Sequence, residues 1–247
     1  MDITISLESF SKEELLAINP FQVTQVLQPQ EIIHIAKALD AFWRYDYQAA
    51  EEGRAGYHAR LRSGKHSDGF FSSYAMLEYP QILTLIANQM KMKILSCCPE
   101  PDYFAGIPEG ATKLGEKIAE LMEIRKAKLK KVNGKIELLS PIPAGKTLML
   151  GEDFCTTGSG IKEAVKNITQ KQPDLNFLYV VPVIIDRGGI KNLDTEETGM
   201  FSILPLARYE INSWPEHQCP LCKKYGSISI KPKATDENWR LITTGQR

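Results

Sequence analysis

Apolar segments alternate with amphipathic helical patterns through the middle of the chain, and this alternation restricts the fold more than any other feature. Residues 102–107 (DYFAGI), 147–153 (TLMLGED) and 176–186 (NFLYVVPVIID) predict buried strands, because they are apolar almost throughout. Apolar residues recur at helical spacing around and between these strands, at Ile82, Leu85, Ile86 and Met90, at Leu114, Ile118 and Leu121, and at Ile161, Ala164, Val165 and Ile168.

This order of elements predicts an α/β fold. Strands that are apolar on both faces need helices on both faces, which is the arrangement of a parallel sheet. Ligands of such sheets bind beyond the carboxyl ends of the strands. Residues 11–50 precede this pattern, and we expect them to be helical, with an apolar face around Ile32 to Leu39 followed by an aromatic cluster.

Polar residues of two kinds follow the predicted strand at 147–153. Two acids end the strand, and a turn of hydroxyl and glycine residues leads into the next helix. Backbone N–H groups at a helix start suit a phosphate, and glycines let it approach closely. Adjacent carboxylates suit hydroxyl groups or a hydrated magnesium ion. The pattern favours a sugar phosphate, although a capped turn that binds nothing has the same composition. The residues are Glu152, Asp153, Thr156, Thr157, Gly158, Ser159 and Gly160.

Composition excludes several classes of partner. The 247 residues suffice for one large domain or two small ones, and 30 basic residues balance 30 acidic ones. We therefore expect neither a nucleic-acid nor a membrane partner. No apolar run approaches the roughly 18 residues that cross a bilayer, and no secretory signal is visible at the start. The five cysteines show no disulfide framework, so we expect a cytoplasmic protein.

Residues 148–160 resemble the motif of type I phosphoribosyltransferases that binds phosphoribosyl pyrophosphate (PRPP). In that motif two acids follow an apolar strand, and Thr-Thr-Gly and a small residue follow after two variable positions. The resemblance implies a parallel sheet flanked by helices, with a small hood formed by the N-terminal and C-terminal segments. It implies that Glu152 and Asp153 hold the ribose hydroxyls and act in catalysis. It also implies that Thr156 to Gly160 bind the 5-phosphate. Mg²⁺ would then bind together with PRPP, without a ligand set supplied by the protein.

The segment AGIPEGATKLGEKIAELM, residues 105–122, resembles the pyrophosphate-binding loop of the same family. Its independent signal is a small-residue turn between a strand and a helix. The resemblance therefore adds four residues to the PRPP site, namely Ile107, Pro108, Glu109 and Gly110.

Six basic residues then lie between Arg125 and Lys135, with a predicted turn at Asn133-Gly134. Such a run is ordinarily a solvated face, but a basic hairpin could also close over pyrophosphate and exclude water. Because the run lies between the two phosphate loops, we favour the second interpretation. By resemblance Arg125 and Lys126 bind PRPP. Lys128, Lys130 and Lys131 compete for the position of the later family lysine, and Lys128 and Lys130 are the candidates for the catalytic lysine. The family has His-Gly where this chain has Asn133-Gly134.

The segment LRSGKHSDGFFSSYAML, residues 61–77, resembles the acceptor-binding part of orotate phosphoribosyltransferases. A basic residue precedes Ser-Gly there and a Phe-Phe pair follows, which suits a flat carboxylated ring. Without the resemblance, the same aromatic residues would be a strand with two core side chains. The Asp-Arg pair in IIDRGG and the first threonine of the PRPP motif match further family positions. Orotate binding is thus assigned to Arg62, Phe70, Phe71, Thr156 and Arg187.

The resemblance implies an enzyme that transfers the phosphoribosyl group of PRPP to orotate, giving orotidine 5′-monophosphate and pyrophosphate in pyrimidine biosynthesis. It also implies a homodimer. Two alternatives stay open, namely a phosphoribosyltransferase for another nucleobase and a PRPP-binding regulator without turnover. The chemistry needs no Ser-His-Asp arrangement, and the four scattered histidines predict neither a triad nor a metal site. These are His34, His58, His66 and His217.

The C-terminal stretch carries a CPLC motif. Cys219 and Cys222 supply half of a tetrahedral zinc site, and we consider His217 or the Cys97-Cys98 pair for the remaining ligands. Structural cysteines without a metal and a redox pair are the alternatives. We expect one domain over 1–247, with a core over about 80–210, an N-terminal helical extension over about 1–55 and a tail over about 211–247.

Overall fold

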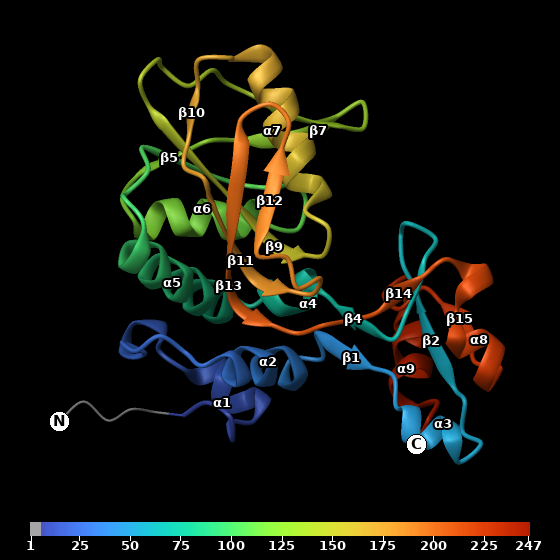
Figure 1. Ribbon diagram of the computed structural model, residues 1–247. Helices are drawn as coiled ribbons and strands as arrows, with labels where there is room; N and C mark the ends of the chain where they lie inside the picture. Colours follow the sequence, from blue (N-terminus) through green and yellow to red (C-terminus); the bar gives the residue numbers. More distant parts are fainter. Residues whose placement is uncertain (1–5) are drawn as a thin grey trace.

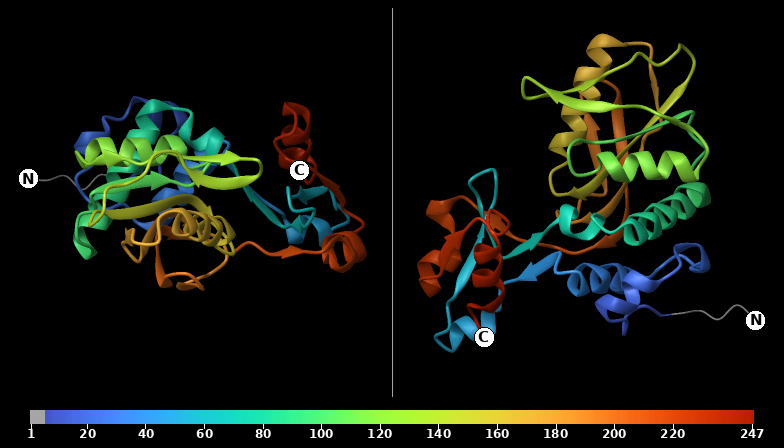
Figure 2. Two further views of the ribbon diagram at one scale, coloured as in Figure 1. Left: turned by 90° about the horizontal axis from the view of Figure 1, so that it is seen from above. Right: turned by 180° about the vertical axis from the view of Figure 1, so that it is seen from behind.

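The computed structural model describes residues 6–247, which form a layered α/β core and a smaller lobe to one side of it (Figure 1). We call residues 43–70 and 213–247 the small lobe. Both views of Figure 2 show the small lobe set off from the core and joined to it by extended chain. The part of the predicted N-terminal extension before residue 6 lies outside the described residues.

The core contains a seven-stranded sheet in the order β12-β13-β11-β9-β5-β6, with β10 beside β9. All its pairings are parallel except β12 with β13, which is antiparallel at one edge. Its strands are β5 (Tyr103–Gly106), β6 (Arg125–Lys126), β9 (Thr147–Cys155), β10 (Asn176–Phe177), β11 (Val180–Asp186), β12 (Asn192–Thr195) and β13 (Gly199–Arg208).

Both faces of the sheet are buried, as the apolar strands predict. Successive residues of a strand point to opposite faces, so Met149 of β9 joins the apolar cluster on one face and Leu150 the cluster on the other. Helices α5 (Pro80–Cys97) and α6 (Thr112–Leu121) pack in the first cluster. Helix α7 (Ser159–Lys171) packs in the second, together with a hairpin of β7 (Leu129–Val132) and β8 (Lys135–Leu138).

The N-terminal segment is helical in most of its first part. Helices α1 (Lys12–Ala17) and α2 (Pro29–Ala38) contribute to the first apolar cluster, on the same face as α5, and the short 3₁₀ helix η1 (Pro20–Gln22) lies between them. The prediction of helix up to residue 50 is wrong for residues 39–46, and helix returns only in α3 (Tyr47–Glu51). Residues Phe42–Arg44 form strand β1, because they pair with strand β4 (Gly69–Phe71), and Phe42 stacks on Phe71 at 4.3 Å. Helix α4 (Ser73–Leu77) then leads back to α5.

The small lobe joins two segments that are far apart in the sequence. Its four-stranded sheet has the order β14-β3-β2-β15, so a hairpin from the first third of the chain lies between two C-terminal strands. Its core is small and centres on Trp43, Tyr45 and Leu221. Its elements are α3 (Tyr47–Glu51), β2 (Tyr57–Arg60), β3 (His66–Ser67), β14 (Ser213–Trp214), η2 (Glu216–Gln218), α8 (Pro220–Tyr225), β15 (Ile228–Ile230) and α9 (Asp236–Thr244).

A buried carboxylate fastens the small lobe to the chain that leaves the core. Asp68 is fully buried and receives hydrogen bonds from the Tyr47 hydroxyl at 2.7 Å and from the backbone and side chain of Asn212, both at 2.9 Å. Arg44 forms an ion pair with the same carboxylate at 3.0 Å. Asn212 follows β13, so this network fixes how the strands at the junction are oriented.

Candidate active site

The carboxyl ends of β5, β9 and β11 lie side by side, because β9 pairs in parallel with both neighbours. The loops after these strands therefore meet at one edge of the sheet. They carry the predicted pyrophosphate-binding residues 107–110, the turn at 156–158 and the segment from Arg187 to Ile190. The acidic pair, Glu152 and Asp153, lies just before this edge, near the carboxyl end of β9. The hairpin β7–β8 and the small lobe project on the same side of the core in every view (Figures 1 and 2).

Two glycines show how closely these loops approach one another. A Cβ atom built on Gly110 would overlap with Oδ2 of Asp153, so the pyrophosphate loop lies directly against that carboxylate. A Cβ atom built on Gly160 would lie 2.8 Å from Oε1 of Glu152 and 3.4 Å from the side chain of Ile107. The structure thus brings the two predicted phosphate loops and the two acids into one site.

Glu152 is held in an unusual electrostatic state. Its Oε2 atom is sealed from solvent and has no hydrogen-bond partner among the described residues. Burial, and next the neighbouring Asp153 carboxylate, raise the pKa of Glu152 to about 8, although Arg187 opposes the rise. A buried acceptor without a partner is costly, so this carboxyl is prepared to accept a hydroxyl group or a cation.

Arg187 lies beside the two acids and also has a buried atom without a hydrogen-bond partner in the described part of the chain. Its Nε atom has no partner among the described residues, and its guanidinium carbon lies 5.6 Å from the ring centre of Phe154. The backbone N–H of Arg187 donates to the carbonyl of Cys155 at 2.7 Å, which fixes the start of the loop after β11. Burial lowers the pKa of Arg187, whereas Asp153 and Glu152 act in the opposite direction. The geometry presents a cation next to two carboxylates.

The turn between β9 and α7 has a geometry that suits an anion. Gly158 is the N-cap of α7 and has a φ of 66°, a left-handed conformation that glycine adopts without strain. No side chain caps this helix start, so the backbone N–H groups of its first turn stay available to a ligand. Cys155 next to it is no nucleophile, because burial raises the pKa of its thiol to about 12.

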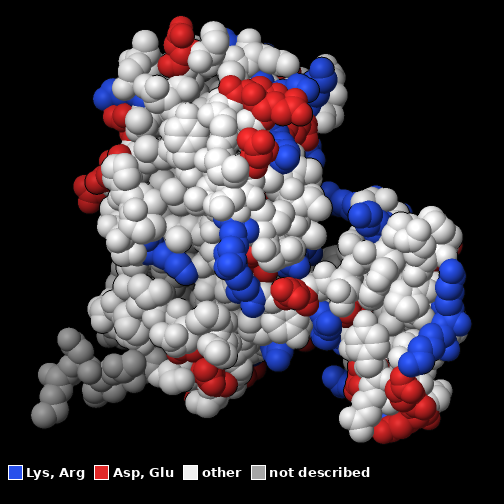
Figure 3. All heavy atoms as spheres, viewed as in Figure 1, with Lys and Arg blue, Asp and Glu red and all other residues white. Residues whose placement is uncertain are grey.

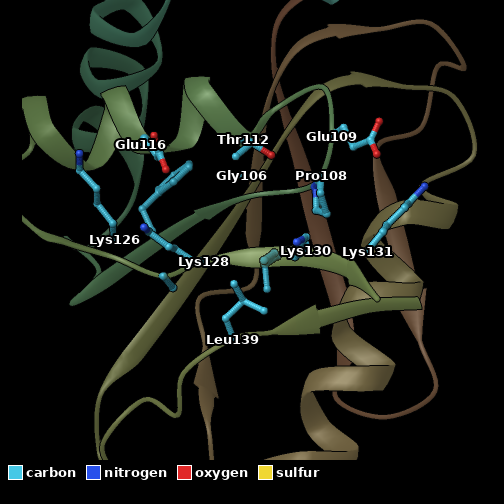
Figure 4. A pocket seen from close by; sticks show the side chains of 13 residues that line it. Gly106, Pro108, Glu109, Thr112, Glu116, Lys126, Lys128, Lys130, Lys131 and Leu139 are labelled. Carbon is cyan, nitrogen blue, oxygen red and sulfur yellow. The ribbon is translucent and has the colours of Figure 1, made fainter. Parts of the chain in front are cut away.

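A pocket of about 300 Å³ lies between the pyrophosphate loop and the basic hairpin. Pro108, Glu109 and Thr112 line it on one side, and Lys128 and Lys130 on the other (Figure 4). The predicted turn at Asn133-Gly134 joins β7 to β8, and both of its residues have the positive φ values, 50° and 81°, that such a turn requires. The basic run is thus a hairpin placed next to the pyrophosphate loop of its own chain. Lys126 and Lys131 line the pocket as well.

The residues predicted to bind orotate do not all meet. Thr156 and Arg187 lie in adjoining loops, because Gly188 packs directly against the carbonyl of Thr156. Phe71 is 3% exposed, and its ring lies 5.4 Å from that of Phe154 in the core. Phe70 points into the small lobe, with Trp239 at 6.2 Å, and Arg62 is exposed in the turn between β2 and β3.

Sequence reasoning found only half of one cluster. It named Cys219 and Cys222 as two possible zinc ligands but took the four histidines as scattered, whereas His58 and His66 lie with these cysteines inside the small lobe, with ligand atoms within 4.8 Å of one another. The candidates considered for this role lie elsewhere. His217 is exposed and contacts Gln218, and Cys97 and Cys98 contact each other at the end of α5. The CPLC motif gave the signal for the cysteines, and the spacing of His58 and His66 across a short hairpin turn was the signal available for the histidines.

Charge and hydropathy at the surface agree with the balanced composition. Figure 3 shows lysines and arginines interspersed with acidic residues on the visible face, without one continuous basic field. Within residues 6–247, no helix combines the length and the apolar character that a bilayer crossing demands.

Comparisons with known proteins identify relatives. No family model matches the chain. An orotate phosphoribosyltransferase of Campylobacter jejuni subsp. doylei is 30% identical over 186 residues, which cover 71% of this chain and 90% of that protein. One of Sulfurimonas denitrificans is 25% identical over 185 residues, with the same coverage of 71% and 90%. The crystal structure of orotate phosphoribosyltransferase from Aeropyrum pernix superposes with a TM-score of 0.53 at 14% identity, over 79% of this chain and 99% of that one, and has the same fold.

Proposed function

Because the chain belongs to the orotate phosphoribosyltransferases, a family of type I phosphoribosyltransferases, we propose that it transfers the phosphoribosyl group of PRPP to orotate. The products are orotidine 5′-monophosphate and pyrophosphate, as in pyrimidine biosynthesis. The observation that carries this proposal is the convergence of Gly110 on Asp153 and of Gly160 on Glu152. A ligand with two phosphate-bearing ends and hydroxyls between them needs two anion loops on either side of acceptor groups.

PRPP is held at three places in this proposal. The uncapped start of α7 receives the 5-phosphate, and residues 107–110 receive the pyrophosphate. Glu152 and Asp153 accept hydrogen bonds from the ribose hydroxyls, and the free Oε2 of Glu152 gains a partner. The same oxygen-rich pair suits Mg²⁺, directly or through its water shell. Bound with pyrophosphate, Mg²⁺ supplies positive charge to the leaving group.

The basic hairpin stabilises the charge that develops as the bond to pyrophosphate breaks. Lys128 and Lys130 line the pocket next to Pro108 and Glu109, where negative charge accumulates on the leaving oxygen. Arg125 and Lys126 extend the basic run toward β5. Closure of the hairpin excludes water from the ribose carbon, which becomes electron-poor in the transition state. Orotate then attacks through its ring nitrogen, so no protein nucleophile is needed.

The acceptor lies between the loop of Thr156 and the small lobe. Arg187 offers a cation to the carboxylate of orotate, and its unpartnered Nε gains an acceptor. Arg62, in the exposed turn of the small lobe, and Phe70 complete the acceptor site when the lobe moves toward the core. Phe71 contributes from behind by packing against Phe154.

We further propose that the chain acts as a cytoplasmic homodimer. The five cysteines are all unpaired, which fits a reducing compartment. Sedimentation equilibrium at micromolar concentration tests the assembly: we expect twice the 27.8 kDa of one chain, and a monomer under these conditions would contradict the dimer.

Turnover with a panel of bases tests the reaction. We expect loss of orotate absorbance on mixing the protein with PRPP, Mg²⁺ and orotate, and none with adenine, hypoxanthine or uracil in its place. Asp153→Asn should abolish this activity, while Asp174→Asn, a change of an exposed acid beyond α7, should leave it intact. Turnover of another base would identify a different phosphoribosyltransferase, and PRPP binding without turnover of any base would identify a regulator.

A further inference from the structure

Four side chains of the small lobe turn their ligand atoms toward one another. They are His58 and His66, from neighbouring strands, and Cys219 and Cys222, at the start of α8. The first three are at most 1% exposed. We propose that these four residues bind one zinc ion, which fastens the N-terminal hairpin of the small lobe to the C-terminal tail. This site is separate from the one at the edge of the core sheet, and zinc binding there does not require the proposed reaction.

Four of the six separations between the ligand atoms are close to those of a tetrahedral ion, and all six are within 4.8 Å. Nε2 of His58 lies 3.0 Å from Nδ1 of His66, 3.6 Å from Sγ of Cys219 and 3.5 Å from Sγ of Cys222. Sγ of Cys222 lies 3.3 Å from Nδ1 of His66. A tetrahedral zinc ion with Zn–S of about 2.3 Å and Zn–N of about 2.0–2.1 Å implies N···S separations of about 3.6 Å and an N···N separation of about 3.3 Å. Small side-chain movements would make the two sets agree.

Local structure explains why the ligands meet. Ala59 pairs with Ser67 and Arg60 with His66 across the β2–β3 hairpin, so His58 and His66 are diagonal neighbours on one face of it. Cys219 is the N-cap of α8 and Cys222 lies three residues later, a spacing that puts both thiols on one side of the helix. Two sequence-local pairs thus supply two ligands each, as in many structural zinc sites.

A hydrogen-bond chain orients the first histidine. Nδ1 of His58 lies 3.0 Å from the hydroxyl of Ser227, and that hydroxyl donates to the carbonyl of Gly56 at 3.1 Å. The hydroxyl has one proton, which it gives to Gly56, so it accepts the N–H of His58. Nε2 of His58 therefore carries the lone pair, and this lone pair faces the cluster. Metal-ligating histidines are typically oriented in this way by their second nitrogen.

The donor set and the size of the lobe favour zinc. Two sulfurs and two imidazole nitrogens in a tetrahedron are typical of Zn²⁺, whereas Mg²⁺ and Ca²⁺ require oxygen ligands. The apolar core of the small lobe is too limited to be stable by burial alone, and a metal that joins residues 58–66 to 219–222 adds folding free energy directly.

Metal analysis of the full-length protein is the first test. We expect about one zinc per chain after purification and dialysis without added metal. Cobalt exchanged into the site should give the strong thiolate-to-cobalt absorption and the intense visible bands of a tetrahedral site, which needs no variant and so avoids failure to fold. A protein that binds neither Zn²⁺ nor Co²⁺, or that contains a Cys219–Cys222 disulfide, would overturn the proposal.

Variants then locate the ion. Cys222→Ser should lose the zinc, whereas Cys97→Ser and His217→Ala, which change the same residue types outside the cluster, should retain it. Ser227→Ala keeps all four ligands and should weaken zinc affinity roughly 10- to 100-fold, because it frees the His58 ring. Hydrogen exchange on chelation should rise in the small lobe and stay unchanged in the core. Zinc retained in Cys222→Ser, or lost from the two controls, would refute this ligand set.

Discussion

At the residue scale, the candidate site is defined by polar atoms that lack partners. Glu152 and Arg187 each keep one buried atom without a hydrogen bond, and both lie at the carboxyl ends of neighbouring strands. Buried polar groups are ordinarily paired, so such exceptions cost stability and point to a ligand.

The acidic pair and its glycine turn could be predicted from sequence because strand, turn and helix are contiguous there. The raised pKa of Glu152 could not, since it depends on burial that only the fold creates.

The pKa of Glu152 has a consequence for stability without ligand. The folded carboxyl binds its proton up to about pH 8, whereas the unfolded one releases it near its ordinary value of 4.5. Between these values the folded protein holds more protons, so the free energy of unfolding falls as pH rises. Glu152→Gln removes the ionisable group, so the free energy of unfolding of the variant should not fall for this reason. From pH 6 to pH 9 we expect the melting temperature of the wild type to fall by roughly 5 °C more than that of the variant.

Thermal melting without PRPP at the two pH values measures this difference. Glu196→Gln, in an exposed turn before β13, is the matched control and should follow the wild type. An equal fall of the melting temperature from pH 6 to pH 9 in the wild type and in Glu152→Gln would contradict the raised pKa of this carboxyl.

Gly110→Ala tests how closely the pyrophosphate loop must approach the acids. The added methyl group overlaps with Oδ2 of Asp153, so either the loop or the carboxylate must move. We expect kcat/KM to fall roughly 100-fold, as for a displacement of about 1 Å in a positioned site. Steady-state kinetics measures the fall, and the melting temperature shows that the protein still folds. Unchanged kcat/KM in a folded variant would show that the two segments act separately.

At the scale of elements, the strands and helices of the core could be predicted from the sequence. The elements before and after the core could be predicted only in part. The strand at 147–153 and the turn at Asn133-Gly134 are confirmed, because each depends on neighbours in sequence. The predicted strand at 176–186 is interrupted and forms β10 and β11, both of which pair with β9. The helical segment expected up to residue 50 is interrupted between Ala38 and Tyr47, because Phe42 pairs with Phe71, a contact that forms only in the folded chain.

Lysines of the hairpin should differ according to whether they line the pocket. Lys130 lines it, and Lys135 is exposed on the same hairpin outside it. Lys130→Ala should lower kcat roughly 100-fold, because it removes positive charge near the leaving group. Lys135→Ala should stay within a factor of about 2, as expected for a solvated charge. Kinetics with saturating PRPP measures both, and equal effects would mean that only the total charge of the hairpin matters.

At the scale of the molecule, the arrangement of the small lobe is the feature that could not be predicted from the sequence. The small lobe is formed by N-terminal and C-terminal segments, as the family resemblance implies for the hood. Helices α1 and α2, however, pack on the core instead of joining the small lobe. Contacts such as that between Asp68 and Asn212 span 144 positions. The periodicity of the sequence contains no sign of such pairings. For the same reason His58 and His66 were not predicted to join Cys219 and Cys222.

The junction between the lobes should depend strongly on Asp68. Asp68→Ala removes the carboxylate that Arg44, Tyr47 and Asn212 share and leaves their donors partly buried without an acceptor. We expect a loss of about 3 kcal/mol in the free energy of unfolding. Asp174→Ala, an exposed acid, should cost less than about 0.5 kcal/mol. Urea unfolding measures both, and similar small losses would contradict the role of the network.

The proposal that three loops converge on one PRPP molecule is tested most directly by calorimetric titration with PRPP and Mg²⁺. The wild type should bind one PRPP per chain. Binding should disappear in Asp153→Asn and weaken in Gly110→Ala, which alters a different loop against the same carboxylate. Binding of PRPP with unchanged affinity in both variants, or no binding to the wild type, would contradict the assignment of this site.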